Sequence, residues 1–203
     1  MRLAIVDELV TSDRAPVELR RLFGIESNLL AHHLDVLESV QMINRTKSSG
    51  DGRRRYVHLV RDSLDGLAPG RRMTPQRALF VCTRNSARSQ LAAALWRSVT
   101  GAPADSAGTH PADTVNPGAI AAAKRAGLDI ADAAPRALTE IAHLPPFVIT
   151  VCDRAHEEIS PEKDWLHWSI ADPVSDGTRQ AFDQAVVELR ARIVVFAPET
   201  VTV

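Results

Sequence analysis

A cysteine and an arginine, six residues apart, follow a short apolar run near the middle of the sequence. Cys82 comes directly after Ala78-Leu79-Phe80-Val81, and Arg88 comes six positions later. A continuous apolar run of this length is typical of a buried parallel strand, and helical periodicity begins at about Ser86. The spacing therefore predicts a strand, a loop and a helix, with the cysteine at the start of the loop.

Such a loop has the chemistry of an anion site. A helix N-terminus presents unpaired N–H groups and a partial positive charge, which together bind anions and favour a thiolate on a nearby cysteine. Arg88 offers a planar fork for two oxygens of the anion, Ser89 can donate a hydrogen bond to the thiolate, and Asn85 suits a left-handed turn. We expect the oxyanion-binding loop to comprise Thr83, Arg84, Asn85, Ser86, Ala87, Arg88 and Ser89, and Cys82 to act as a nucleophile toward arsenate or phosphate.

An acid and a second cysteine follow two later apolar runs. Asp172-Pro173 comes shortly after residues 166–170, and Cys152 comes directly after residues 147–151. Displacing an oxygen from an oxyanion needs a proton donor to the leaving group, which Asp172 could supply, although an Asp-Pro pair is more often only a turn. The carboxyl ends of parallel strands meet at one edge of a sheet, so Cys152 is either a second thiol near Cys82 or a buried small hydrophobe.

Strand and helix patterns alternate after residue 77. Strands are expected at 78–81, 103–107, 147–151 and 166–170, and helices at 86–99, 116–126 and 178–195. This alternation predicts an α/β domain over residues 77–203, with a four-stranded parallel sheet flanked by helices. Gly, Pro and charged residues are mixed over 63–76, which we interpret as a linker.

A different pattern occupies residues 1–62. Apolar positions recur at helical spacing from Leu3 to Val10, and a helix beginning at Pro16 ends at Gly24. The next helix, after Glu26, has an expected buried stripe of Leu29, Leu30, Leu34, Leu37 and Val40. Two short helices joined by a glycine turn match a helix-turn-helix, and residues 42–47 and 53–60 flank a Gly-rich turn as a hairpin does. Together they predict a winged helix-turn-helix domain.

In a winged helix the second helix enters the DNA major groove by its N-terminal part. The side chains expected to face DNA are Ser27, Asn28, Ala31 and His32, with Arg53, Arg54 and Arg55 of the wing on phosphates. Residues 1–77 hold 13 Lys and Arg against 10 Asp and Glu, whereas residues 78–203 hold 11 against 15. The excess of basic residues in residues 1–77 favours DNA binding. The alternative is a winged helix that only dimerises or docks.

Composition bounds the rest. The 203-residue chain has a net charge of −1, and no apolar run approaches the roughly 20 residues that cross a bilayer. Acids occur among the first eight residues, where a signal peptide would be apolar, and two sparse cysteines suit a reducing compartment. We therefore expect a cytoplasmic protein with no membrane partner, no metal and no bound cofactor.

Two resemblances follow from these motifs. Residues 1–62 resemble ArsR-type regulators over Val17–Leu37, including the segment His-His-Leu-x-x-Leu. Residues 77–198 resemble the low-molecular-weight tyrosine phosphatases and, within them, the arsenate reductases. The second resemblance is carried by Val81–Gln90, Ser106–Thr109, Val115–Pro117, Gly127–Ile130, Thr150–Asp153 and His167–Pro173. A tyrosine phosphatase would place aromatic residues around the mouth of its cleft, whereas the single tyrosine, Tyr56, lies in the other domain.

The second resemblance implies that Cys82 attacks arsenic, that Asp172 protonates the leaving oxygen, and that Arg88 holds other oxygens. Cys152 matches the first resolving cysteine of the reductases. Ser160-Pro161 stands where thioredoxin-coupled members have a further cysteine, so an external thiol reductant is expected: mycothiol, or a glutaredoxin- or thioredoxin-like system.

Three further positions depart from the families. Arg84 replaces the usual loop glycine, which could strain the turn or widen anion preference, and Ala93 replaces the acid of a potassium site. ArsR-type metalloid sensors use helix cysteines, and residues 1–77 contain none.

The leading interpretation is a fusion that reduces arsenate with an external thiol, binds operator DNA as a homodimer and regulates arsenic resistance. The first alternative is a low-molecular-weight tyrosine phosphatase, in which water resolves the Cys82 adduct. The second is a transcription factor that senses an oxyanion without turnover.

Overall fold

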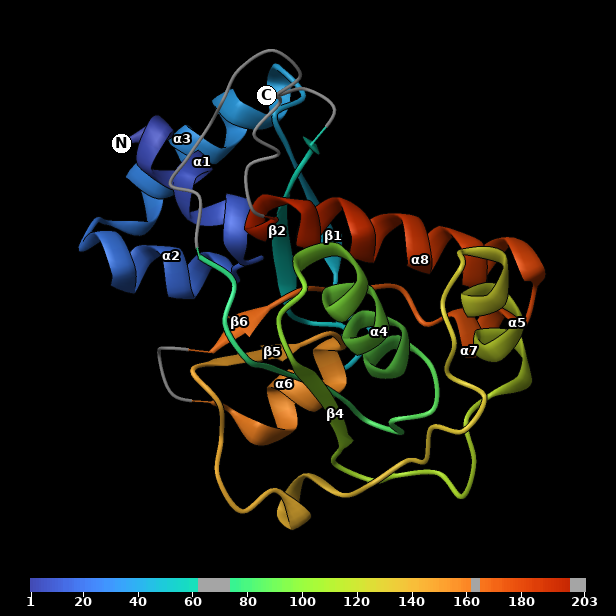
Figure 1. The fold of residues 1–203 in the computed structure, drawn as a ribbon. Coiled ribbons are helices and arrows are strands. Elements are labelled where there is room, and N and C mark those ends of the chain that lie inside the picture. Colours follow the sequence, from blue (N-terminus) through green and yellow to red (C-terminus); the bar gives the residue numbers. More distant parts are fainter. Residues whose placement is uncertain (62–73, 162–164, 198–203) are drawn as a thin grey trace, which may run out of the picture. The chain divides into compact units, whose positions relative to one another are not determined.

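The chain divides into two compact units, Met1–Arg71 and Arg72–Val203. The computed structural model describes residues 1–61, 74–161 and 165–197 (Figure 1). Most of the linker predicted at 63–76 lies outside these ranges, and the two units are described separately. No helix in the described ranges is long and apolar enough to cross a membrane.

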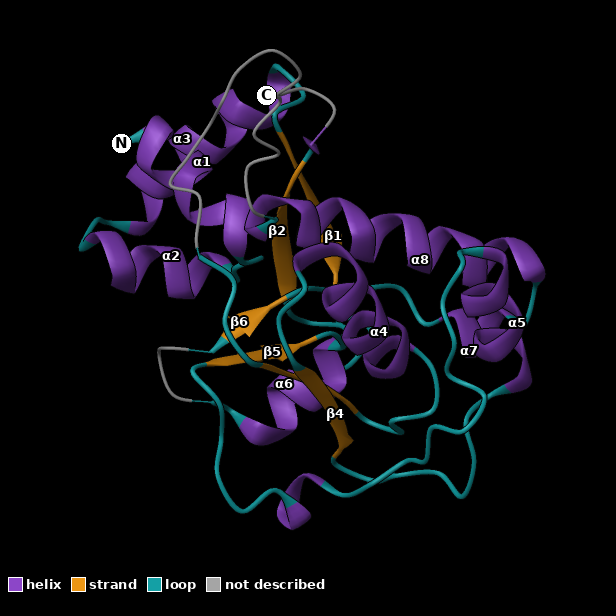
Figure 2. Cartoon of the chain, viewed as in Figure 1, coloured by secondary structure: helices purple, strands orange, loops and turns teal. Residues whose placement is uncertain are grey.

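The first unit consists of three helices followed by an antiparallel hairpin (Figure 2). Its elements are α1 (Arg2–Thr11), α2 (Pro16–Phe23), α3 (Ser27–Ser39), β1 (Ile43–Lys47) and β2 (Arg55–Leu59). Pro16 occupies the first turn of α2, where its missing N–H costs nothing, and the left-handed Gly24 (φ 62°) ends that helix. The register pairs Ile43 with Leu59 and Lys47 with Arg55.

The buried stripe of α3 is narrower than predicted. Leu30, Leu34 and Leu37 are buried, at i, i+4 and i+7 of one helix face. Leu29 and Val40 are 45% and 59% exposed, so their predicted burial is wrong. Leu29 is turned by one residue, about 100°, away from Leu30, and Val40 is the residue after the helix end.

The second unit is an α/β fold with a four-stranded parallel sheet, in the order β4-β3-β5-β6. Its strands are β3 (Ala78–Cys82), β4 (Ala104–Gly108), β5 (Phe147–Thr150) and β6 (Leu166–His167). Its longer helices are α4 (Arg88–Thr100), α5 (Pro117–Arg125), α6 (Asp153–Ile159) and α8 (Arg179–Ile193), and its short ones are α7 (Pro173–Asp176), η2 (Leu138–Glu140) and η3 (Val194–Phe196). The predicted fourth strand, 166–170, is reduced to two residues, and α6 and α7 were not predicted.

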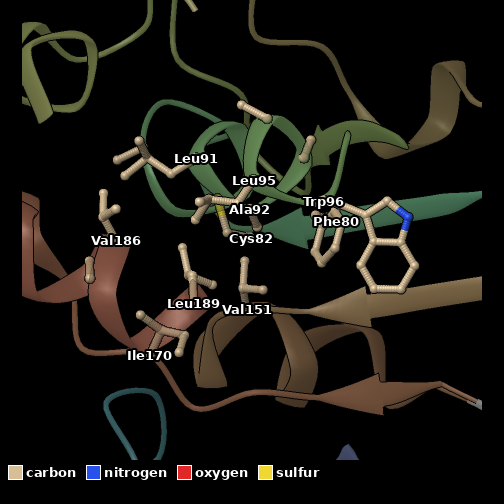
Figure 3. Close-up of a cluster of buried hydrophobic side chains, with 14 of the residues drawn as sticks. Phe80, Cys82, Leu91, Ala92, Leu95, Trp96, Val151, Ile170, Val186 and Leu189 are labelled. Atoms are coloured by element: carbon tan, nitrogen blue, oxygen red, sulfur yellow. The ribbon is translucent and has the colours of Figure 1, made fainter. Parts of the chain in front are cut away.

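Helices cover both faces of the sheet (Figure 1). On one face, the aromatic ring of Phe80 and the side chains of α4 and α8 form a core that includes Leu91, Trp96 and Leu189 (Figure 3). On the other face, Ile159 of α6 packs on a smaller cluster of β3 and β5 side chains. Cys82 ends the central strand, with β4 on one side and β5 on the other. This is a topological switch point, where α/β folds bind ligands.

Candidate active site

Two hydrogen-bond donors converge on the Cys82 sulfur at the end of β3. The Asn85 backbone N–H lies 3.2 Å from it, and the Ser89 hydroxyl oxygen lies 3.1 Å from it. Asn85 Nδ2 donates to the same hydroxyl oxygen at 2.8 Å. Because that amide nitrogen can only donate, it leaves the Ser89 proton to point at sulfur. Both groups can therefore donate to the Cys82 sulfur, in a side chain that is only 3% exposed.

The carbonyl groups of the loop are turned outward. The backbone N–H groups of the segment after β4 donate to them, in the pairs Thr109 to Cys82, His110 to Thr83, Ala112 to Arg84 and Asn116 to Ser86, at 2.8–3.2 Å. Within the ranges that the structure describes, the N–H groups of Arg84, Ser86 and Ala87 have no acceptor. A loop with its carbonyls tied outward presents its N–H groups inward, as an anion cradle requires.

Asn85 is the left-handed residue of the loop, as its residue type predicted. Its φ is 49° and it is fully buried. Its side-chain oxygen accepts the Arg136 N–H at 2.9 Å, and its backbone oxygen accepts from Gln90 Nε2 at 3.0 Å. Arg84 has no left-handed backbone and is exposed, so the strain considered for this position does not arise.

Gly108, at the end of β4, allows the loop to approach the sheet. A Cβ on this residue would lie 2.8 Å from the Thr83 oxygen and 3.0 Å from Asn85 Cβ, closer than carbon atoms pack. Gly108, Gln90 and Arg136 were not predicted to support the loop, although the first two occur within the family motifs.

A half-buried ion pair anchors Arg136. Its Nη2 lies 2.9 Å from Asp105 Oδ1, and Arg77 lies 2.8 Å from the other carboxylate oxygen. Burial alone would raise the pKa of Asp105, but hydrogen bonds from the two arginines outweigh it and lower that pKa. The carboxylate therefore stays charged at neutral pH and holds the residue whose backbone supports Asn85.

Arg88 and Asp172 are brought together beside the loop. Arg88 is the first residue of α4; its Nη2 lies 3.0 Å from Asp172 Oδ2, and its Nη1 donates to the Ile170 carbonyl at 3.0 Å. Asp172 Oδ1 accepts the Val174 N–H at 3.1 Å and so caps α7. The cap orients the carboxylate, and the arginine holds it next to the anion cradle.

Cys152 lies against the same loop at the end of β5. Val81 pairs with Thr150 across the sheet, so Cys152 falls beside Thr83. Its sulfur is 3.2 Å from the Thr83 hydroxyl oxygen and accepts the Ala155 N–H at 3.5 Å, as the N-cap of α6. Both cysteines are free and buried. The second thiol therefore contacts the residue that follows the first one.

Two positions noted as departures supply neither a thiol nor an acid. Ser160 is the exposed, left-handed residue (φ 46°) that ends α6. Ala93 is 2% exposed and packs in the core beside α4 neighbours.

The residues expected to face DNA are all exposed in the first unit. Ser27, Asn28, Ala31 and His32 are exposed on the N-terminal half of α3, and Arg53, Arg54 and Arg55 are exposed at the hairpin. Ser27 accepts a hydrogen bond from Arg20 Nη1 at 3.0 Å. Arg45 pairs with Asp35 and Glu38, and its hydrogen bond lowers the pKa of Glu38, so this cation is already neutralised.

The family model for low molecular weight phosphotyrosine protein phosphatase matches residues 77–201. An arsenate reductase of Brevibacillus brevis is 33% identical over 125 residues, which cover 58% of this chain and 91% of that protein. Among solved structures, an arsenate reductase in the phosphate binding state has a TM-score of 0.50 and 24% identity, covering 59% of this chain and 94% of that one. An arginine phosphatase from Geobacillus stearothermophilus has a TM-score of 0.52 and 26% identity, covering 60% and 90%.

The chain thus belongs to the low molecular weight phosphotyrosine protein phosphatase family. Residues 77–201 form an enzyme domain of the arsenate reductase and phosphatase type.

Proposed function

We propose that the chain reduces arsenate to arsenite by thiol chemistry at Cys82, with electrons from an external thiol. The observation that carries the proposal is the second thiol, whose sulfur lies 3.2 Å from the hydroxyl of the residue after Cys82. A phosphatase needs only one thiol, because water resolves its adduct. The 33% identity to an arsenate reductase supports the same choice.

In the first step, the Cys82 thiolate attacks arsenic and forms a sulfur–arsenic bond. One arsenic–oxygen bond breaks, and the oxygen leaves as water after protonation by Asp172, the proposed acid. Arg88 and the inward N–H groups of the loop hold the remaining oxygens. Since Arg88 pairs with Asp172 at 3.0 Å, a doubly charged anion would compete for the arginine and release the carboxyl group toward the leaving oxygen.

In the second step, the Cys152 thiolate attacks the Cys82 sulfur. A disulfide forms, the electron pair of the sulfur–arsenic bond stays on arsenic, and As(V) leaves as As(III) in arsenite. The two cysteines together lose the two electrons that arsenic gains. Ser160 cannot accept the disulfide, so regeneration requires an external reductant: mycothiol, or a glutaredoxin- or thioredoxin-like protein.

The test is arsenite production by the full chain with mycothiol, glutathione with glutaredoxin, and thioredoxin as separate donors. We expect turnover with at least one donor, and none in Cys82→Ser. If Cys82→Ser still produces arsenite, the mechanism is wrong. If the protein makes no arsenite but hydrolyses a phosphotyrosine analogue through Cys82, it is a phosphatase. If it only binds arsenate, it is a sensor without turnover.

We further propose that the first unit binds DNA as a homodimer, in the manner of a winged helix, and couples arsenate chemistry to regulation of arsenic resistance. The supporting observation is the exposure of the four α3 residues and three arginines named above. Arginine contacts to phosphate give salt-dependent affinity, so each lost contact reduces the slope of log affinity against log salt by about 1.

The matched variants are a triple Arg53→Gln, Arg54→Gln, Arg55→Gln change and an Arg190→Gln control on α8 of the other unit. We expect the triple variant to weaken retention of the protein's own upstream DNA and the control to leave it unchanged. Retention by the wild type that is absent, or that ignores salt, contradicts the proposal.

A further inference from the structure

Four buried polar side chains surround the stretch of backbone that carries Cys152. They are Thr150, Asp153, His156 and His167, between 0% and 6% exposed. Three of them flank the cysteine in sequence, two positions before it and one and four positions after it. The fourth comes from β6, whose register places it opposite Thr150. The mechanism above assigns no task to any of the four.

Hydrogen bonds connect these side chains in a row. Asp153 Oδ1 lies 3.1 Å from His167 Nε2, and His167 Nδ1 lies 2.9 Å from the Thr150 hydroxyl oxygen. His156 Nδ1 lies 2.9 Å from the same oxygen. The two imidazole rings are stacked, with centroids 4.1 Å apart and planes at 20°. The row thus ties the first turn of α6 to β5 and β6.

The donors in this row are constrained. The Thr150 hydroxyl has a single proton, and the Leu166 carbonyl, 3.3 Å away, competes for it with the two imidazoles, so at least one Nδ1–H must donate to the hydroxyl oxygen. A carboxylate only accepts, so His167 Nε2 donates to Asp153. Each side chain is fixed by its neighbours, and removing one member changes the arrangement of the others.

This row lies close to the reactive thiol. Thr150 is the last residue of β5 and Cys152 follows it by two positions, so at about 3.3 Å per residue their Cα atoms lie within about 6.6 Å of each other. Asp153 begins the helix whose N-cap is Cys152. A buried polar row is not the most stabilising way to join β5 and β6, since well-packed apolar residues often do as well or better. It does fix one geometry of the turn at Cys152, which is what attack on a neighbouring sulfur needs.

We propose that Asp153 and His167, with Thr150 and His156, are positioning residues for the resolving thiol: they hold the Cys152 turn in the arrangement that attacks the adduct at Cys82. This inference rests on the proposed function. It concerns the second step alone, because the row contacts neither Arg88 nor Asp172 among the hydrogen bonds of the described residues.

The experiment measures the two sites separately in Asp153→Ala, Asp153→Asn and the exposed-histidine control His143→Gln. Two measurements report whether the Cys82 loop is intact. They are the rate at which iodoacetamide alkylates Cys82, and the reduction of that rate by inorganic phosphate. The second step is followed by the rate at which the Cys82–Cys152 disulfide forms after arsenate is added without any external thiol. Samples are quenched in acid and analysed by mass spectrometry.

We expect Asp153→Ala to slow disulfide formation by about 10-fold to 100-fold, while alkylation and phosphate protection change less than about twofold. Asp153→Asn keeps an oxygen acceptor for His167 Nε2 and should recover most of the rate. His143→Gln should match the wild type in both measurements.

Equal slowing of alkylation and disulfide formation in Asp153→Ala, or no slowing at all, overturns the inference. If Asp153→Ala does not fold, Thr150→Val, which keeps the side-chain shape, replaces it. Its rate of disulfide formation is then compared with its rate of Cys82 alkylation. If the wild type itself forms no disulfide while arsenate protects Cys82, the proposed function has failed and the positioning role fails with it. A normal wild-type rate with unaffected variants rejects the positioning role alone.

Discussion

The ends of β3 and β5 each carry a buried cysteine, but the surroundings of the two sulfurs differ. Cys82 is 3% exposed and accepts from groups of its own loop, whereas Cys152 is 1% exposed and contacts Thr83 and the first turn of α6. Burial alone would make both of them small core hydrophobes. The different donors around the two sulfurs are what support the proposed roles of Cys82 as nucleophile and Cys152 as resolving thiol.

The comparison also shows what each site depends on. The Cys82 loop is specified by contacts from Gly108, Arg136 and Gln90, which act whatever the state of Cys152. In the proposed mechanism, Cys152 acts only on the adduct at Cys82. Changes to the groups that support the Cys82 sulfur should therefore affect both partial reactions, and changes to the groups that contact the Cys152 sulfur should affect only the second.

The largest expected effect follows exchange of each sulfur for oxygen. Cys82→Ser should lower both arsenite production and hydrolysis of a phosphotyrosine analogue by at least about 10³-fold, because a serine hydroxyl at this position has no adjacent base to ionise it. Cys152→Ser should abolish arsenite production but leave arsenate binding at Cys82 intact. Steady-state kinetics measure arsenite production, and the protection of Cys82 from alkylation by arsenate measures binding. If the two variants behave alike in both measurements, the proposed difference between the two cysteines is wrong.

Asp172→Asn should come next, with a fall of about 10²-fold to 10⁴-fold in the rate of the Cys82 step. The amide cannot donate an acidic proton, but its oxygen can still accept the Val174 N–H that caps α7. Because the ion pair with the buried Arg88 is lost, the temperature of thermal unfolding should fall modestly while the protein remains folded. A variant that loses activity only in proportion to its loss of folded protein would show that Asp172 is a cap and not the acid.

Gly108→Ala should have an intermediate effect at the β3 end. The new Cβ would lie 2.8 Å from the Thr83 oxygen, and relieving the overlap should cost about 1–3 kcal/mol of unfolding free energy. The loop should also bind phosphate more weakly, as measured by isothermal titration. Gly52→Ala, where a Cβ has open space, is the matched control. Unchanged phosphate affinity would show that the loop tolerates displacement.

Thr83→Val should have the smallest effect, on the step in which Cys152 acts. Valine keeps the shape of threonine but loses the hydroxyl that lies 3.2 Å from the Cys152 sulfur, a contact worth about 1 kcal/mol. Disulfide formation after arsenate should change about fivefold, and Thr83→Ser should restore the wild-type rate. A change of equal size in Cys82 alkylation would place the effect on the loop and not on Cys152.

Much of this could be predicted from sequence, because the strongest signals are local. An apolar run before Cys82, a left-handed Asn85 and an arginine at the helix start are read within one segment. The four-stranded sheet followed from alternation in the same way. The predicted burial of Leu29 and Val40 was wrong. The buried face of α3 is narrower than the run of leucines suggests, and Val40 lies after the helix end.

Support from distant segments could not be read in this way. The row from Asp153 through His167 to Thr150 depends on the register of β5 with a two-residue strand. Gly108 is required only because the loop folds back over the end of β4. The hydrogen-bonded row and the need for Gly108 both result from tertiary packing. The periodicity of a single sequence carries no information about such packing.

The most direct test of the account is a single turnover without external thiol. The full chain is mixed with one equivalent of arsenate, quenched in acid, alkylated and digested for mass spectrometry, with arsenite measured in parallel. The account predicts that arsenite appears in step with a disulfide that joins the Cys82 and Cys152 peptides. Arsenite released while Cys152 remains fully alkylated, or no arsenite while both thiols remain free, would contradict it.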